Sequence, residues 1–306
     1  MPIAEPVADA RRALRPNVTG AWDGETVLSY GALSRTGPKR PSTGIDPCSL
    51  EFAVLDTETT GLDPHDDRIC EVAVLRVRGD GTVLDSYDTL VDPARPIRNA
   101  GFHGIVDADV RGAPEFGAIA ADLLDRMSGA ILVAHNLAFD ARMLAAELRR
   151  AGLAPPPLVG LCTLTTSRAQ LDLPSYRLPA ILRVLLGAPP PRPHWALGDA
   201  RACALLLGGL LGAGPRPLRY HGPAAPAVAL PEGARAFSST PASLPRAVAG
   251  AAPPEPLSYG RGAPGWQAAW RPHELNPELC RGRFTPMRRT RARLAAWCRD
   301  LTGYWR

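Results

Sequence analysis

The order of strand and helix signals between Leu50 and about Gly212 restricts the fold of this chain most strongly. Three successive strands are predicted first, at Phe52–Asp56, Ile69–Val77 and Thr82–Val91, with a hairpin signal at Gly79-Asp80-Gly81. Alternating signals follow for a helix, a buried strand and three helices, at Pro114–Met127, Ala130–Ala134, Ala138–Ala151, Arg177–Leu186 and Leu197–Leu211. This order predicts an α/β fold with a mixed sheet flanked by helices.

Composition divides the chain into four parts. Residues 1–47 are polar and rich in Arg, Pro and Gly, and we expect a flexible N-terminal extension with at most a short hairpin. Residues 48–212 hold the strand and helix signals. Residues 213–268 are dominated by Ala, Pro and Gly, which predicts a linker without a core of its own. Residues 269–306 are basic and contain aromatic side chains, with a short basic helix expected at Thr290–Leu301.

Charge, cysteine spacing and hydropathy indicate the cellular compartment and the kinds of partner to expect. The six cysteines are scattered, and none lies in a CxxC pair or a zinc-binding spacing, which predicts buried, reduced thiols in a cytoplasmic protein. No apolar run reaches the roughly 18 residues of a membrane span, and the N-terminus lacks the apolar region of a secretory signal. We therefore expect no membrane partner. The net charge of +5 is compatible with a polyanionic partner without requiring one.

Two carboxylates two residues apart, Asp56 and Glu58, come where the first predicted strand should end. In an extended chain such residues project to the same side, so the two carboxylates point together. Like charges that close normally need a shared proton or a cation, and Mg²⁺ is held by one or two carboxylates together with water and phosphate oxygens. A solvated turn explains the pair equally well when it is taken alone. The following Thr59-Thr60-Gly61 adds hydroxyls and a flexible glycine where a nucleotide could approach.

Two further polar groups stand at element boundaries. His135 and Asn136 follow the strand Ala130–Ala134, and Asp140 lies in the first turn of the next helix, where a carboxylate can also be a simple cap. His194 and Asp199 open the last helix, after a PPPRP segment that holds His194 on a stiff loop. Each group alone permits a purely structural explanation. Their occurrence together, each at a boundary, favours one shared site.

The three groups resemble the motifs of the DEDDh branch of the DnaQ-like 3′–5′ exonucleases, which includes the proofreading epsilon subunit of bacterial DNA polymerase III, ribonuclease T and oligoribonuclease. Asp56–Gly61, His135–Asp140 and the His-x4-Asp of His194 and Asp199 match the three motifs. His103-Gly104-Ile105 and Ser175–Leu178 resemble secondary motifs of the family. The resemblance covers about residues 50–212 and implies a ribonuclease H-like fold.

The resemblance also implies a two-metal mechanism. Four carboxylates would hold two Mg²⁺ or Mn²⁺ ions about 3.5–4 Å apart, namely Asp56, Glu58, Asp140 and Asp199. His194 would act as the general base that takes a proton from the attacking water. The terminal nucleotide would be contacted by Thr59, Thr60, Gly61, His103, Asn136 and Phe139. The expected substrate is a single-stranded or frayed 3′ end, DNA rather than RNA, cleaved to nucleoside 5′-monophosphates in proofreading or repair.

Alternatives remain open at this point. RNA trimming uses the same metal site, because such a site is indifferent to the sugar. A non-catalytic scaffold that holds strand ends would be expected to lack a carboxylate, and none is missing. The basic C-terminal segment could contact nucleic acid or dock a polymerase or another protein partner. Gln170–Pro174 resembles peptides that bind the sliding clamp, although packing explains it better. We expect residues 213–306 to be dispensable for cleavage of a short oligonucleotide.

Overall fold

A mixed β-sheet forms the centre of the molecule. The computed structural model describes residues 20–21, 27–35, 44–186, 194–212, 218–228 and 244–246. The central strands are β4 (Glu51–Thr59), β5 (Ile69–Arg78), β6 (Val83–Leu90), β7 (Ile131–Ala134) and β8 (Leu158–Cys162). Strands β4, β5 and β6 form an antiparallel meander, and β7 and β8 continue the sheet parallel to β4. This arrangement confirms the predicted mixed α/β sheet.

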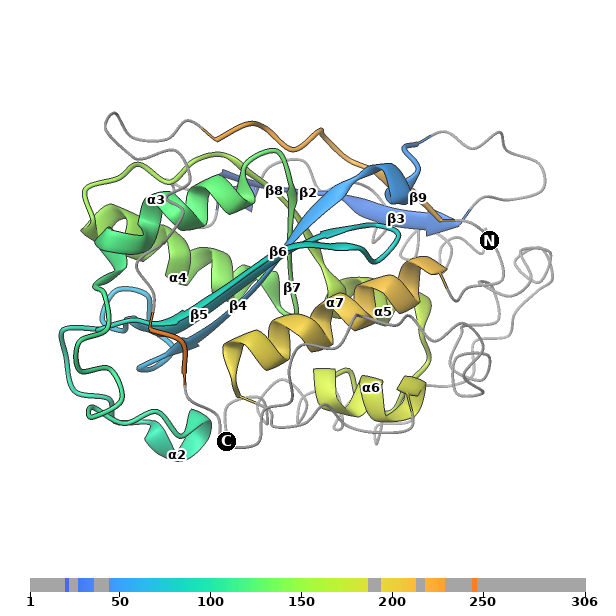
Figure 1. Cartoon of the computed structure of the whole chain (residues 1–306). Helices are drawn as coiled ribbons and strands as arrows, with labels where there is room; N and C mark the ends of the chain where they lie inside the picture. Colours follow the sequence, from blue (N-terminus) through green and yellow to red (C-terminus); the bar gives the residue numbers. More distant parts are fainter. Residues whose placement is uncertain are drawn as a thin grey trace, which may run out of the picture.

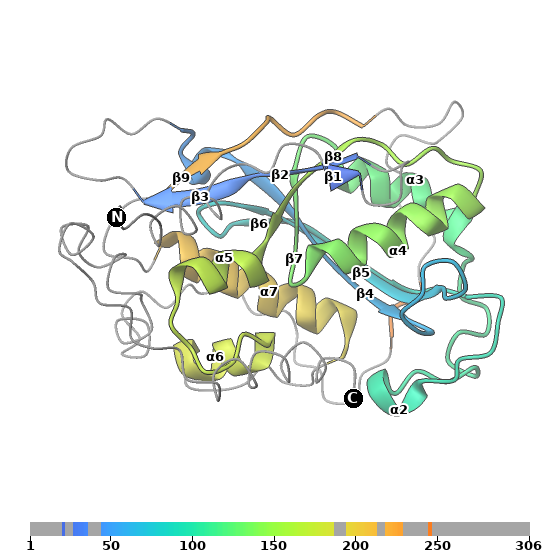
Figure 2. The same cartoon turned by 180° about the vertical axis from the view of Figure 1, so that it is seen from behind.

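Residues of the predicted N-terminal extension widen this sheet. Strand β2 (Val27–Tyr30) pairs parallel with β8, and β1 (Gly20–Ala21) pairs antiparallel with β2, which gives the order β1-β2-β8-β7-β4-β5-β6 (Figure 2). Leu28 is fully buried. The antiparallel pair of β1 and β2 is the short hairpin that the sequence allowed in this extension. The parallel pairing of β2 with β8 was not predicted, and it forms because the edge of β8 offers backbone groups that a short strand can satisfy.

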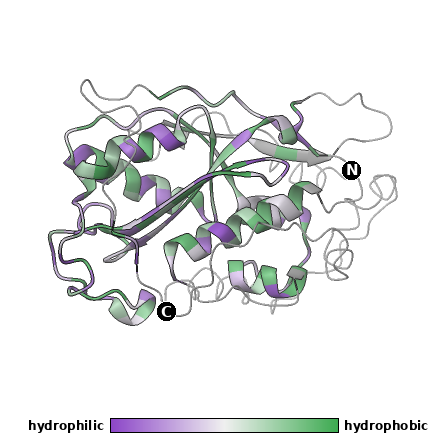
Figure 3. Ribbon diagram, in the orientation of Figure 1, coloured by the Kyte–Doolittle hydropathy of each residue, from purple (hydrophilic) through white to green (hydrophobic). Residues whose placement is uncertain are grey.

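Helices cover both faces of the sheet (Figure 1). One face is covered by α3 (Phe116–Met127) and α4 (Leu137–Arg150), and the other by α7 (Ala196–Gly212), with α5 (Thr163–Gln170) beside α7 and α6 (Leu178–Leu186) packed on α7. Figure 3 shows hydrophobic colour along most of α7, interrupted by a hydrophilic stretch near its start. The short α2 (Ala100–His103) lies beyond the sheet, and the 3-10 turn η1 (Pro47–Ser49) leads into β4.

Successive side chains of β4 belong to the two cores on opposite faces of the sheet. Phe52 and Val54 belong to the apolar cluster beneath α6 and α7, whereas Ala53 and Leu55 belong to the cluster beneath α3 and α4. Side chains alternate between the two faces of a strand. Asp56 and Glu58 therefore continue on the α7 side, and Thr57 continues on the α4 side.

Two stretches of the predicted linker pack onto the domain. Strand β9 (Leu218–His221) pairs antiparallel with β3 (Ala32–Arg35) and buries Tyr220, so close to Gly31 that an added Cβ there would lie 2.2 Å from Tyr220 Cε2. Further on, the buried Val228 donates its backbone N–H to Ser128 Oγ at 2.9 Å. The composition of residues 213–268 did not predict these contacts, in which buried side chains of the segment complete the packing of the domain.

The expectations for the cysteines, for membrane-spanning helices and for the C-terminal helix can be compared with the structure only where it describes the residues. Cys70, Cys162 and Cys203 are buried, whereas Cys48 is exposed. Within the described part of the chain, no helix has both the length and the apolar character needed to cross a membrane. Cys280, Cys298 and the helix expected at Thr290–Leu301 lie outside the described residues.

Candidate active site

The ends of β4 and β7 and the start of α7 open into a pocket of about 650 Å³. All five predicted catalytic side chains line this pocket: Asp56, Glu58, Asp140, His194 and Asp199. Five of the six predicted substrate contacts line it as well: Thr59, Gly61, His103, Asn136 and Phe139. The sixth, Thr60, is not among the lining residues, and its hydroxyl donates to Asp67 Oδ1 at 3.0 Å.

Strand β4 continues through the acidic pair rather than ending before it. The strand runs to Thr59, so Asp56 and Glu58 are held by ladder pairing opposite Ala73 and Glu71 of β5. The register of the β4–β5 ladder shifts between Glu58 and Thr59. A bulge at this point bends the strand and re-aims the side chains that follow it. The two carboxylates therefore stand on a rigid element directly before a turn.

The second motif places Asp140 at the start of α4. Asn136 adopts a left-handed conformation with φ of 81°, which turns the chain sharply from β7 into the helix. Asp140 lies in the first helical turn, where the helix dipole favours an anion. Thr57 Oγ1 donates to Asp140 Oδ1 at 2.9 Å, so a hydroxyl from the α4 side of β4 orients this carboxylate.

The third motif brings His194 and Asp199 together through the backbone. The His194 N–H donates to Asp199 Oδ2 at 2.8 Å, and His194 has φ of 66°, an uncommon conformation for a residue with a side chain. One ligand atom from each of Glu58, His194 and Asp199 lies within 4.8 Å of the others. The first turn of α7 thus carries its carboxylate to the side of the sheet where Glu58 points.

Burial shapes the protonation of the site. It is the largest cause of the raised pKa of Asp56 and of Glu58, and the charge of Asp199 is the next cause for both. Burial also raises the pKa of Asp140 to about 7 and that of Asp199 to about 6. It lowers the pKa of His194, so this imidazole is neutral at pH 7 and able to accept a proton.

The donor set fits a hard divalent cation. Four carboxylates that line one pocket repel one another when ionised, and bound positive charge would offset this repulsion. Carboxylate oxygens are the ligands that Mg²⁺ and Mn²⁺ prefer. Asp56, Glu58, Asp140 and Asp199 all line the pocket, and their role as ligands of such ions stays a prediction.

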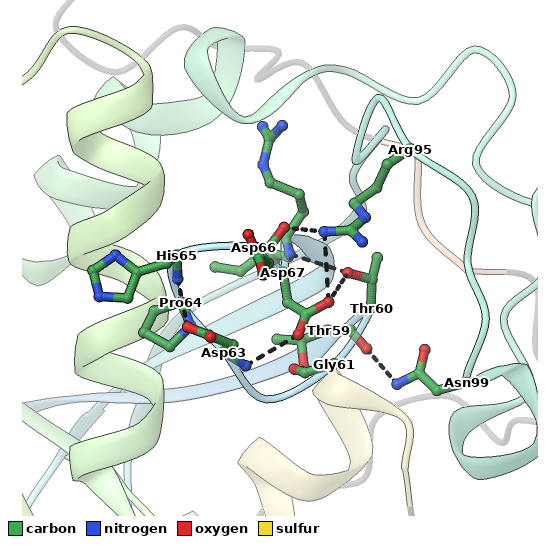
Figure 4. A network of polar contacts seen from close by, with 12 residues as sticks. Thr59, Thr60, Gly61, Asp63, Pro64, His65, Asp66, Asp67, Arg95 and Asn99 are labelled. Carbon is green, nitrogen blue, oxygen red and sulfur yellow. Dashed lines mark hydrogen bonds and ion pairs between the residues drawn. The ribbon is translucent and has the colours of Figure 1, made fainter.

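The turn after β4 is fixed by side-chain bonds (Figure 4). Asp67 accepts from the Thr60 hydroxyl through Oδ1 at 3.0 Å and from the Asp63 N–H through Oδ2 at 3.0 Å. Arg95 Nη1 lies 3.6 Å from Asp67 Oδ1. An added Cβ at Gly61 would lie 2.3 Å from Asp67 Oδ2, so a larger residue there would displace the Asp67 carboxylate. The Thr60 hydroxyl thus holds the turn beside the pocket through Asp67. A direct contact between Thr60 and a substrate stays a prediction.

A chain of hydrogen bonds links α2 to β4. Asn99 Nδ2 donates to Thr59 O at 2.8 Å, and Asn99 Oδ1 lies 3.2 Å from His103 Nε2 (Figure 4 shows the Asn99 end). The Ile105 N–H donates to His103 Nδ1, so the ring proton of this histidine is on Nε2. Burial lowers the pKa of His103 to about 4, which keeps the ring neutral. His103 is thereby held at the pocket wall in one tautomer.

The family assignment follows from the comparison with known proteins. The family model RNase_T, described as exonuclease, matches residues 53–207. The chain belongs to this exonuclease family. The match spans all three acidic motifs and confirms the family predicted from them.

Several relatives of this chain are much longer proteins. It is 34% identical over 155 residues to the DNA polymerase III PolC-type of Thermotoga petrophila, covering 50% of this chain and 11% of that one. It is 36% identical over 212 residues to the putative bifunctional exonuclease/endonuclease protein MT2247 of Mycobacterium tuberculosis, covering 64% and 32%. A DNA polymerase III subunit epsilon-like protein of Rhodobacter capsulatus is 39% identical over 147 residues, covering 45% and 20%. The chain thus spans at most about a third of these relatives.

Solved structures of E. coli exonuclease I also resemble this chain. The complex with a dT13 oligonucleotide gives a TM-score of 0.48 at 18% identity, covering 52% of this chain and 40% of that one.

The sequence did not single out several residues that line this pocket. The Phe102 ring lies 4.0 Å from the His194 ring, centroid to centroid, and Phe102 is 43% exposed. Arg177 and Arg183 line the pocket from the α6 side. Phe102 directly precedes the His103-Gly104-Ile105 motif, and Arg177 lies within the Ser175–Leu178 motif, so both motifs could have drawn attention to these residues. Arg183 has no such local signal, because only the packing of α6 brings it to the pocket.

His135 has a structural role within the second motif. Its Nε2 donates to Tyr176 O at 2.8 Å, and its Nδ1 lies 3.0 Å from Thr163 Oγ1. Burial lowers the pKa of His135 to about 4. This neutral ring ties the end of β7 to the Ser175–Leu178 segment, which forms another wall of the pocket.

Proposed function

We propose that this chain is a metal-dependent 3′–5′ exonuclease that hydrolyses the terminal phosphodiester of DNA and releases nucleoside 5′-monophosphates. The observation that carries the proposal is the convergence of four carboxylates and a neutral histidine in one pocket of a member of an exonuclease family. The names of relatives that are DNA polymerase III proteins favour DNA over RNA. A scaffold without catalysis has no need for four mutually repelling carboxylates in one buried pocket.

Asp56, Glu58, Asp140 and Asp199 would hold the ions from three directions: the end of β4, the start of α4 and the start of α7. When bound, two Mg²⁺ or Mn²⁺ ions supply Lewis acidity that activates a water and stabilises charge on the leaving 3′ oxygen. The Thr57 hydroxyl keeps the Asp140 carboxylate oriented toward this centre. The rigid strand and the two helix starts keep the carboxylates in place before the substrate arrives.

His194 accepts the proton of the attacking water in this proposal. Its lowered pKa keeps the imidazole in the basic form at neutral pH. The bond from its backbone N–H to Asp199 and the contact of its ring with Phe102 restrict where the imidazole can lie. A general base held in one orientation is available when the terminal phosphate enters.

The remaining pocket residues would bind the strand end. Thr59, Gly61 and Asn136 offer backbone and side-chain polar groups beside the carboxylates, and Phe139 and His103 offer ring surfaces. Arg177 and Arg183 supply positive charge on the α6 wall, where the next phosphates along the strand would pass. A polymerase or other protein partner for residues 269–306 stays a prediction, as does a cytoplasmic location.

Cleavage of labelled strands tests the proposal. The full-length chain, Asp56→Ala and the matched control Asp80→Ala, whose carboxylate lies in the β5–β6 hairpin, are incubated with 5′-labelled single-stranded DNA and RNA in Mg²⁺, Mn²⁺ or EDTA. We expect a ladder that shortens from the 3′ end with either metal, persists in Asp80→Ala and is absent from Asp56→Ala. Equal cleavage by Asp56→Ala would overturn the assignment of the site. If RNA were cleaved faster than DNA, RNA would be the preferred substrate instead.

A further inference from the structure

A short segment downstream of the exonuclease motifs is anchored beside the active site. Leu244 donates its N–H to Thr89 Oγ1 at 2.8 Å and accepts from the Leu90 N–H at 2.9 Å, so its backbone is bound to the end of β6. Thr89 itself is fully buried. Figure 1 shows this segment as the short dark-orange stretch between the end of the sheet and α2. Two residues later, the side chain of Arg246 reaches the third motif.

The Arg246 guanidinium joins three separate parts of the pocket wall. Its Nη1 donates to His194 O at 3.1 Å and lies 3.4 Å from Glu71 Oε2, and its Nη2 donates to His103 O. The planar guanidinium has several donors in a fixed geometry, which suits simultaneous contact with several acceptors. Gly104 makes room for it, because an added Cβ there would lie 3.3 Å from Arg246 Nη2.

Glu71 gives this guanidinium a buried carboxyl partner, whose pKa burial raises to about 7. The carboxylate is 1% exposed, and its Oε2 also accepts from the Ala196 N–H, in the first turn of α7, at 3.1 Å. Glu71 stands opposite Glu58 in the β4–β5 ladder. The pair of Glu71 and Arg246 therefore connects the β-sheet to the start of α7, which carries the third motif.

Both backbone groups of His194 are held by these contacts. The N–H donates to Asp199, and the carbonyl accepts from Arg246. His194 has a positive φ, which a non-glycine residue adopts only when the surroundings stabilise it. This backbone conformation sets the direction of the Cα–Cβ bond that carries the imidazole. Without the hydrogen bond from Arg246, the backbone carbonyl of His194 would no longer be held.

We propose that Arg246 is a positioning residue for the general base: it holds His194 in the orientation needed for catalysis, and the catalytic unit therefore extends beyond the last family motif to residue 246. This inference rests on the function proposed above. Arg246 acts through His194 and Glu71 rather than on the substrate.

A double-mutant cycle tests whether Arg246 acts through His194. Initial rates on a short 5′-labelled DNA are measured for Arg246→Ala, Arg246→Lys, His194→Ala, the double variant His194→Ala/Arg246→Ala, and the control Arg219→Ala on β9. Displacement of a catalytic group by about 1 Å costs on the order of 10²-fold in rate, so we expect Arg246→Ala to lower kcat about 10–100-fold while KM changes less than about threefold. Lysine has no planar fork and should restore only part of kcat.

The double variant separates positioning from a general structural effect. Without the imidazole there is no base to position, so Arg246→Ala should change the rate of the His194→Ala protein less than about threefold. Arg219→Ala should behave as the unaltered protein. A penalty of equal size in both backgrounds, or a kcat of Arg246→Ala within about threefold of the unaltered chain, would overturn the proposal.

Hydrogen exchange gives a readout that does not depend on catalysis. In the metal-free Arg246→Ala protein, the amides of residues 194–199 should exchange at least about tenfold faster, whereas those of β7 should be unchanged. Unchanged exchange at 194–199 would refute the positioning role. If the unaltered chain showed no metal-dependent hydrolysis, the proposed function would fail, and the exchange result would still decide whether Arg246 holds the His194 loop.

Discussion

Replacement of Asp140 by asparagine should stabilise the metal-free protein at alkaline pH. Asp140 is 4% exposed, and burial raises its pKa from 3.8 to about 7. A carboxyl group that binds its proton more tightly in the folded state contributes its full stability below about pH 4. That contribution is lost as the pH rises from about 4 to about 7. At pH 8 the ionised group therefore destabilises the fold unless a cation neutralises it.

The size of the effect follows from the two pKa values. The difference between 3.8 and 7 corresponds to about 4 kcal/mol at about 1.4 kcal/mol per unit. An amide has the same shape, is always neutral and retains Oδ1 as the acceptor for the Thr57 hydroxyl. The free energy of unfolding of Asp140→Asn should exceed that of the unaltered chain by about 4 kcal/mol at pH 8 and by about 2 kcal/mol at pH 5. For a domain of this size the advantage at pH 8 raises Tm by about 10 °C.

Thermal unfolding in EDTA at pH 8 and pH 5 measures this difference, with Asp125→Asn on α3 as a matched control outside the pocket. Addition of Mg²⁺ at pH 8 should raise the Tm of the unaltered chain, because the ion binds the folded state, and should raise that of Asp140→Asn much less. The reasoning is refuted if Asp140→Asn has no advantage at pH 8, or if its advantage does not decrease at pH 5.

Three further predictions concern the base, the basic wall and the C-terminal packing. His194→Ala should lower kcat about 10²–10⁴-fold while calorimetry shows Mn²⁺ affinity within a few-fold; an unchanged rate would exclude His194 as the base. Arg183→Ala should raise KM and lower the slope of log KM against log salt by about 0.7, the value for one phosphate contact of a single strand. An unchanged slope would mean that Arg183 does not contact phosphate. A chain that ends at residue 212 lacks β9 and Arg246, so, against the expectation from composition, it should lose both stability and kcat, whereas a chain that ends at residue 246 should retain them. Wild-type kcat in the shorter chain would show that these contacts are dispensable.

Local patterns in the sequence were sufficient for the centre of the fold. The apolar run before Asp56, the hairpin signal at Gly79-Asp80-Gly81 and the helical periodicity of α3, α4, α6 and α7 each depend on neighbouring residues, and each was found in its place. The projection of Asp56 and Glu58 from the same face of β4 is equally local, because side chains alternate along a strand and residues two apart share a face. These features could be predicted because backbone geometry alone determines them.

Elements that depend on distant partners were missed. Strand β8 contains Gly160, which weakens a strand signal, but an added Cβ there would lie 2.3 Å from Leu137 Cδ2, so packing against the start of α4 requires the glycine. Strands β2 and β9 are too short to be stable alone, and they exist because β8 and β3 offer edges to them. The side chain of Thr60 turns to Asp67 for a hydrogen bond that no local rule indicates.

The sequence by itself determined which chemistry the chain carries: acidic residues and a histidine, at the boundaries of strands and helices, in the order of an exonuclease family. Only the tertiary structure decided how these groups are supported. Arg246 meets Glu71 across 175 residues of chain, and Thr57 meets Asp140 across 83. Contacts over such separations leave no periodic or local signal, because they form only when the packed sheet and helices bring their partners together.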